Sequence, residues 1–147
     1  MVELKAVVEI KQIRNGEVIQ AETKKNVTCN AGIAALAQLI GGLTSGGFTY
    51  VGIGTGSYAT VSATITALAS QLYRVQSVGV IMGNTNVTGD TAQITAGFTI
   101  SGQTGTVSVT EAGLFNQSGS LLGYLVIGTY SMVNGDQLSL TWSEVVG

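Results

Sequence analysis

The sequence predicts an all-β fold, an antiparallel β-sandwich or jelly-roll of about eight strands with one short α-helix. Several short segments alternate apolar and polar residues, as half-buried strands do. The chain has 21 Gly and no Pro, so its turns depend on Gly, Asn, Asp and Ser, which reach positive φ or form side-chain turns. Only one segment has helical spacing, whereas a parallel α/β sheet needs a helix between successive strands.

A β-hairpin is expected at the N-terminus, beginning with a strand over residues 2–10. Its apolar positions are Val2, Leu4, Ala6, Val8 and Ile10, and its charged positions are Glu3, Lys5 and Glu9. Asn15-Gly16 then supplies a type I′ turn, because both residues tolerate positive φ, and residues 17–23 return as the partner strand. Residues 1–25 are therefore expected to form a charged hairpin that is able to act as an arm. The whole chain, residues 1–147, is expected to form one domain.

The next expected element is a helix over residues 31–40. Asn26, Thr28 and Asn30 are its plausible N-caps. Its expected apolar face consists of Ile33, Leu36, Ala37 and Ile40. Gly41-Gly42 is expected to end the helix.

Six more strands are expected after the helix, separated by turn-forming residues. They cover residues 48–53, 71–82, 91–101, 106–115, 121–130 and 137–146. Between the first two of them, residues 57–70 are uncharged and rich in Ser, Thr and Ala. This segment is interpreted either as a long exposed loop or as an arm that lies on a neighbouring subunit.

Charge is distributed very unevenly along the chain. Nine of the 14 charged residues lie within residues 1–25. The whole chain is 10% charged, whereas about a quarter is usual for a soluble domain. We therefore expect other protein, most simply copies of the same chain, to cover the body of the molecule.

Composition also argues against several partners. A net charge of −2 with six basic residues provides no basic stripe for nucleic acid. The longest helix-like apolar segment, residues 31–40, is far shorter than the roughly 20 residues that span a bilayer. The first residues lack the features of a secretory signal, so export by that route is not expected unless a leader has been removed.

The chain offers little for catalysis or metal binding, and we expect no cofactor, no metal and no enzymatic activity. It has no His and one Cys, Cys29, so the usual zinc ligands and a His base are missing. Residues 50–56 read YVGIGTG, but the following residues, SYATVSAT, do not read as a helix, and no Lys or Arg lies near. Close approach of backbones is therefore favoured over phosphate binding. The one enzymatic alternative is glycan cleavage by Glu111 and Asp136.

The candidate site residues are expected to make two kinds of contact, with another subunit or with a glycan. The candidates for intersubunit contact are Tyr73, Arg74, Glu111 and Trp142. Arg74 is expected to form an ion pair with Glu111 or Glu144 of a neighbouring subunit. Tyr58 and Tyr130 are candidates for stacking on a glycan, although core or interface positions are favoured for such scattered aromatic residues.

Five short motifs follow the hairpin in order. They are NVTCNAGIAAL from residue 26, YVGIGTG from residue 50, LYRV from residue 72, VTEAGLF from residue 109 and NGDQLSLTW from residue 134. In this order the chain resembles small structural proteins of tailed viruses, bacteriophage or archaeal, including capsid-decoration proteins and tail-fibre or baseplate modules. The resemblance implies a β-sandwich, assembly most often as a homotrimer, and a role in holding or decorating the particle.

We therefore expect a virion structural protein, made in the host cytoplasm, whose partners are its own copies and other capsid or tail proteins. The charged hairpin or a Gly/Ser/Thr-rich arm would attach it to the particle. The alternative is a carbohydrate-binding module at a host-recognition tip, with a host glycan as partner. Neither nucleic acid nor a membrane is an expected partner.

Overall fold

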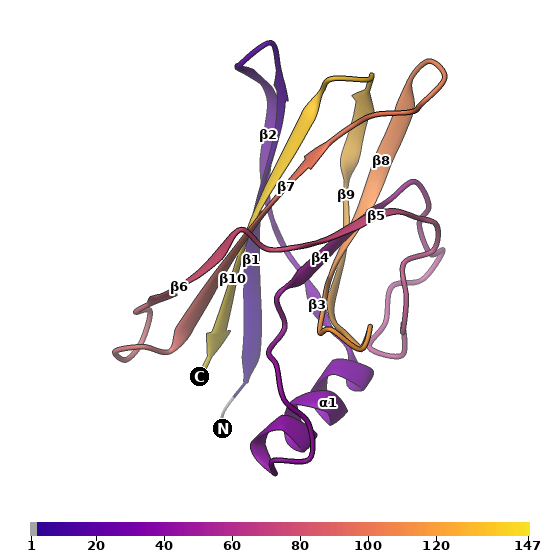
Figure 1. Cartoon of the computed structure of the whole chain (residues 1–147). Helices are drawn as coiled ribbons and strands as arrows, with labels where there is room; N and C mark the ends of the chain where they lie inside the picture. The colour runs from indigo at the N-terminus through magenta and orange to yellow at the C-terminus, as the bar shows by residue number, and fades with distance from the viewer. Residues whose placement is uncertain (1–2) are drawn as a thin grey trace.

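The computed structural model describes residues 3–147, so Val2 of the expected first strand lies outside the described residues. Two antiparallel five-stranded sheets pack together as a β-sandwich (Figure 1). Sheet A has the order β2 (Glu17–Lys25), β1 (Leu4–Arg14), β10 (Gln137–Val146), β7 (Thr91–Thr99) and β6 (Gly79–Gly83). Sheet B has the order β3 (Val27–Thr28), β9 (Leu121–Met132), β8 (Val107–Phe115), β4 (Tyr50–Gly54) and β5 (Gln71–Gln76).

The predicted all-β class with one short helix is confirmed, but there are ten strands instead of about eight. One addition is the two-residue β3, which pairs with β9. The other arises because the expected strand over residues 71–82 is two strands in different sheets. The Ser77 N–H still donates to Thr49 O at 2.7 Å, next to sheet B, and the Val78 N–H donates to Thr95 O of sheet A at 3.0 Å.

The N-terminal hairpin forms as expected and is an integral part of sheet A. Asn15 and Gly16 have φ values of 52° and 78°, as a type I′ turn requires. β1 pairs with β2 on one side and with β10 on the other, and Val8 and Ile10 are buried in the core. The hairpin is thus built into the sandwich and is not a detached arm.

Three lysines of the hairpin pair with glutamates on the same strand. Lys5 Nζ lies 2.9 Å from Glu3 Oε2, and Lys11 Nζ lies 3.1 Å from Glu9 Oε1. On β2, Lys24 Nζ lies 3.9 Å from Glu22 Oε2. Each of these three lysines therefore has a negative charge two residues away.

The main core fills the space between the sheets. Its largest fully buried side chains include Trp142, Tyr130, Ile53, Leu114 and Leu140. They come from both sheets, as expected for an aligned sandwich. Burial of this apolar surface is the main source of stability.

Helix α1 (Asn30–Ile40) lies at the end of the sandwich near the C-terminus (Figure 1). It ends where expected, with the Gly41 N–H donating to Ala37 O at 3.0 Å. The expected apolar face is wrong, because Ile33 and Ile40 are 46% and 81% exposed. The helix instead packs through Gly32, where a Cβ atom would lie 2.6 Å from Leu121 O. Cys29 occupies the N-cap position without a side-chain cap.

Residues 57–70 cover the outer face of sheet B of their own chain, so they are not an arm on a neighbour here. Ile65 and Leu68 are buried in a second apolar cluster that includes Phe115, Leu121 and Tyr124. No helix within residues 3–147 is long and apolar enough to cross a membrane.

Candidate functional site

Glu111 is a buried carboxylate that fixes the loop over sheet B. Its Oε1 accepts from the Ala69 N–H and the Tyr124 hydroxyl, both at 2.8 Å. Its Oε2 accepts from the Ser70 N–H at 2.7 Å and the Gly56 N–H at 3.3 Å. Both carboxylate oxygens accept hydrogen bonds and the side chain is fully buried. Glu111 therefore cannot contact a neighbouring subunit or a glycan. It is a structural anchor.

The glycine motif at residues 50–56 makes room for this anchor. A Cβ atom on Gly54 would collide with the Glu111 carboxylate, with the Glu111 Cδ only 2.8 Å away. A Cβ atom on Gly52 would lie 3.2 Å from Leu68 Cδ1 of the loop. The predicted close approach is confirmed, although these two glycines lie in strand β4 and not in a turn.

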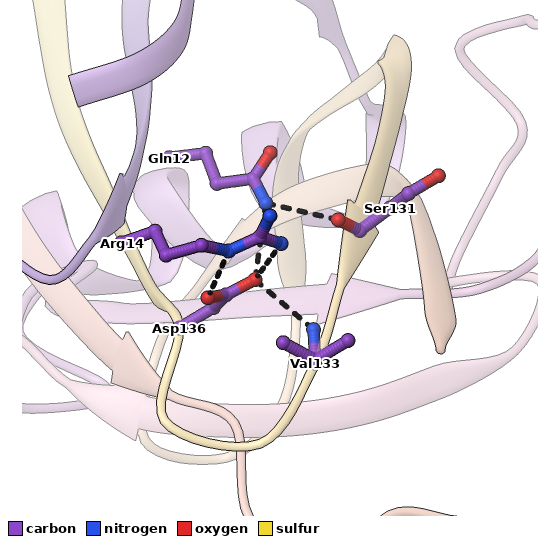
Figure 2. A network of polar contacts seen from close by, with 5 residues as sticks. All are labelled: Gln12, Arg14, Ser131, Val133 and Asp136. Atoms are coloured by element: carbon purple, nitrogen blue, oxygen red, sulfur yellow. Dashed lines mark hydrogen bonds and ion pairs between the residues drawn. The ribbon is translucent and has the colours of Figure 1, made fainter. Parts of the chain in front are cut away.

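Asp136 is held in a network that joins the two sheets (Figure 2). Arg14 donates from Nε to Oδ1 at 2.9 Å and from Nη2 to Oδ2 at 2.7 Å. Gln12 donates from Nε2 to Oδ2 at 3.2 Å and to Ser131 O at 2.9 Å, and the Val133 N–H donates to Oδ2 at 3.0 Å. The Arg14 guanidinium holds the pKa of Asp136 well below its usual range. The two carboxylates of the enzymatic alternative, Glu111 and Asp136, are thus both fully hydrogen-bonded within the fold.

The two tyrosines proposed for glycan stacking differ in access. Tyr130 is fully buried in the main core, so it offers no ring face to a sugar, and burial raises the pKa of its hydroxyl. Tyr58 is half-buried. Its hydroxyl donates to Ala67 O at 2.6 Å, and its ring packs edge-to-face on Tyr124 with centroids 5.4 Å apart. The structure therefore does not bring the two rings together on a platform.

Two of the proposed intersubunit residues, Tyr73 and Arg74, reach the surface on β5. The Arg74 guanidinium carbon lies 5.8 Å from the Tyr50 ring centroid and 5.5 Å from that of Phe115. Within residues 3–147, Arg74 forms no ion pair. The Tyr73 hydroxyl donates to Ser101 O at 2.8 Å.

The acidic partners proposed for Arg74 are out of reach of another subunit. Glu111 and Glu144 are both buried inside their own sandwich. Trp142, the fourth proposed contact residue, is also fully buried, and its Nε1–H donates to Glu144 Oε2 at 3.1 Å. Trp142 is therefore a core residue.

Sequence reasoning missed an exposed apolar surface at the free edge of sheet A, which we call the β6 edge: Val78, Val80, Ile81 and Met82. Ile81 and Met82 are 66% and 62% exposed. No charged residue occurs within residues 75–89. The apolar residues 78–82 within this uncharged stretch are the available signal, but the pattern predicts the end of one long strand.

The β6 edge is preorganised by the loop that follows it. Asp90 accepts hydrogen bonds from the backbone N–H groups of Thr85, Asn86 and Val87 at 2.8, 2.8 and 3.0 Å. These bonds, led by that from Val87, lower the pKa of Asp90. The ionised carboxylate thus fixes the turn between β6 and β7.

Comparisons with known proteins identify no relatives: no family model, no curated protein and no solved structure matches this chain. The function proposed below therefore depends on the residues and surfaces of the chain itself.

Proposed function

We propose that this protein is a structural component of a tailed-virus particle, which assembles as a symmetric oligomer on the capsid or the tail and has no catalytic activity. The ordered motifs described above suggest the class of protein. The observation that carries the proposal is the uncharged β6 edge of a charge-poor molecule. Such a protein is made in the host cytoplasm and acts on the particle.

The β6 edge has the properties of a self-association surface. An edge strand leaves a row of backbone N–H and C=O groups unpaired, and soluble monomers protect such edges with Lys, Pro or a bulge. β6 has neither charge nor Pro. Val80 lies opposite the buried Ile94, and Ile81 lies opposite Gln93 and is directed to the other face. A strand that is apolar on both faces is typical of one covered on both faces.

The form of oligomer depends on what β6 contacts. Pairing of β6 with β6 of a second copy gives a two-fold dimer, whereas a ring of three needs a heterologous contact. The opposite edge of sheet A is β2, which exposes the apolar side chains of Val18 and Ile19. Contact of β6 with β2 of the next copy would continue the sheet, and this is the arrangement that suits a homotrimer.

The deciding experiment is the solution mass of the purified chain, measured by light scattering during size-exclusion chromatography. We expect three times the 15.0 kDa chain mass. Incubation with purified capsids and tails, followed by co-sedimentation, then identifies the part of the particle that it binds. A stable monomer that sediments with neither would overturn the proposal.

A monomer would favour the carbohydrate-binding alternative, which now depends on Tyr58 without Tyr130. A glycan array distinguishes this case, since the virion proposal requires no glycan. Turnover of a glycan that is abolished by Glu111→Gln would favour an enzyme. The buried, fully bonded Glu111 argues against that result.

A further inference from the structure

A small apolar pocket lies between the two sheets at the end capped by helix α1. Its volume is about 140 Å³. The walls used in the argument below are Leu36 of α1, Phe48, Ala92 and Ile94 of β7, Leu114 of β8 and Leu122 of β9. Val146, half exposed at the end of β10, lies at its rim.

Among the described residues that line this pocket, Glu144 is the only titratable one. It lies on the inward face of β10 between Ala6 of β1 and Ala92 of β7, whose small side chains leave space beside the carboxyl group. The residue is only 6% exposed. Lys5, the nearest lysine along β1, pairs with Glu3 instead.

The carboxyl group of Glu144 is incompletely bonded. Oε2 accepts from Trp142 Nε1–H, but Oε1 is buried and has no partner among the described residues. By contrast, every carboxylate oxygen of the buried Glu111 and Asp136 accepts a hydrogen bond. A buried acceptor without a partner is costly, so the site is incomplete as it stands.

The chemistry of the pocket defines what would complete it. The walls accept a hydrocarbon body, and the free acceptor needs a hydrogen-bond donor. Among residues 3–147, no cation lines the pocket, so an ionised Glu144 also lacks the opposite charge that makes a buried charge tolerable. A protonated amine supplies both the donor and the charge.

We propose that this pocket binds a small apolar primary amine, with the ammonium group on the Glu144 carboxylate and the hydrocarbon body against Phe48, Leu114 and Leu122. Because Oε1 is fully buried, binding requires the carboxylate to turn toward the pocket that the Glu144 side chain lines. A cavity of about 150 Å³ lined by apolar side chains holds one benzene ring, so benzylamine is a suitable probe. The site is independent of the β6 edge, and occupancy does not require oligomerisation.

The test is a titration of the intact chain with benzylamine, followed by two-dimensional NMR. Saturable shifts are expected at Leu36, Phe48, Ala92 and Ile94. Benzyl alcohol and toluene, which fill the same space without a charge, should bind about tenfold more weakly or less. Binding of the amine should be tighter at pH 8 than at pH 5.5, because protonation of Glu144 removes its charge.

Two variants and one control complete the design. Glu144→Gln keeps the side-chain shape and should weaken benzylamine about tenfold, whereas Glu9→Gln, on the exposed face of β1, should have no effect. Ala92→Leu fills the pocket while Glu144 is intact, and it should block benzylamine binding. This variant keeps the proposal testable if Glu144→Gln folds poorly.

Absence of saturable shifts would overturn the proposal, and so would equal binding of toluene and benzylamine or unchanged binding by Glu144→Gln. A crystal structure with only an ordered water on Oε1 after soaking in benzylamine would have the same meaning. None of these results alters the solution mass, so failure of this site and failure of the virion proposal are distinguishable.

Discussion

The Tyr124 hydroxyl donates to Glu111 Oε1 at 2.8 Å across the neighbouring strands β9 and β8. Tyr124 also packs against Tyr58 of the covering loop, and Glu111 binds the backbone of that loop. The two residues thus join sheet B to the 57–70 segment by both apolar and polar contacts.

Glu111→Gln should loosen this segment. The substituted amide group would direct an N–H donor at backbone donors, leaving buried groups unpaired at a cost of about 1–3 kcal/mol. We expect a loss of about 2 kcal/mol in the free energy of unfolding by urea and faster proteolytic cleavage within residues 57–70. Glu9→Gln is the matched control and should change stability by less than about 0.5 kcal/mol. Equal proteolysis of the two variants would contradict the anchoring role.

Asp136 should contribute to acid sensitivity. Its pKa is lowered in the folded state, chiefly by Arg14, so its stabilisation is present above the unfolded pKa of about 4 and is lost as pH falls toward the folded value. Urea midpoints measured between pH 2 and pH 6 should fall with decreasing pH. Asp136→Asn should reduce this dependence below pH 4. An unchanged slope in the variant would show that other carboxylates dominate.

Glu144 should act in the opposite direction. Burial raises its pKa to about 7 from the ordinary value of 4.5. Between pH 4.5 and pH 7, the folded state therefore keeps a proton on Glu144 that the unfolded state has released. Its contribution to stability is therefore full below about pH 4.5 and declines as pH rises through 7, by roughly 3 kcal/mol in total. Glu144→Gln should remove this decline. The check is urea unfolding from pH 5 to pH 8.5, and a wild-type stability that rises over this range without a matching change in the variant would contradict the assignment.

Ile81→Lys should dissociate the oligomer. A lysine at the centre of β6 places a charge on an edge that must be desolvated on pairing. The expected mass by light scattering is that of a single chain that keeps its fold, with a melting temperature lowered by no more than the loss of assembly accounts for. Ile40→Lys, at an isoleucine on α1 that is still more exposed than Ile81, should leave the mass unchanged. If Val18→Lys also dissociates the assembly, β6 meets β2; if it does not, β6 pairs with itself.

Gly32→Ala should destabilise the protein although alanine is the better helix former by about 1 kcal/mol. The added methyl group would meet the backbone of Leu121 and Leu122, and overpacking costs about 1–3 kcal/mol. A net loss of about 1–2 kcal/mol in chemical unfolding is expected. Gly97→Ala, where nothing lies within 4 Å, serves as the control. Stabilisation by Gly32→Ala would mean that the helix is not in direct contact with β9.

Local patterns predicted the elements whose cause is local. The alternation in β1 and the Asn15-Gly16 turn identify the hairpin, and Gly41 marks the end of α1. The buried face of the helix was not predictable in the same way, because it depends on the approach of Gly32 to Leu122, which is distant in sequence.

The candidate site was harder to predict for the same reason. The strand-like pattern of residues 71–82 gives no sign that the chain changes sheets between Gln76 and Gly79, so it does not reveal the β6 edge. An isolated Glu111 in an apolar strand could have indicated a buried anchor, but its backbone partners lie 41 to 55 residues away.

The paired charges on the N-terminal hairpin affect the electrostatic interaction between copies of the molecule. Because Lys5, Lys11 and Lys24 each have an acidic neighbour within 4 Å, each pair behaves as a short dipole whose field fades quickly with distance. Exposed charges are in any case screened beyond about 8 Å at physiological ionic strength. These three pairs therefore exert almost no long-range repulsion, and they hinder the approach of two copies no more in dilute buffer than in salt.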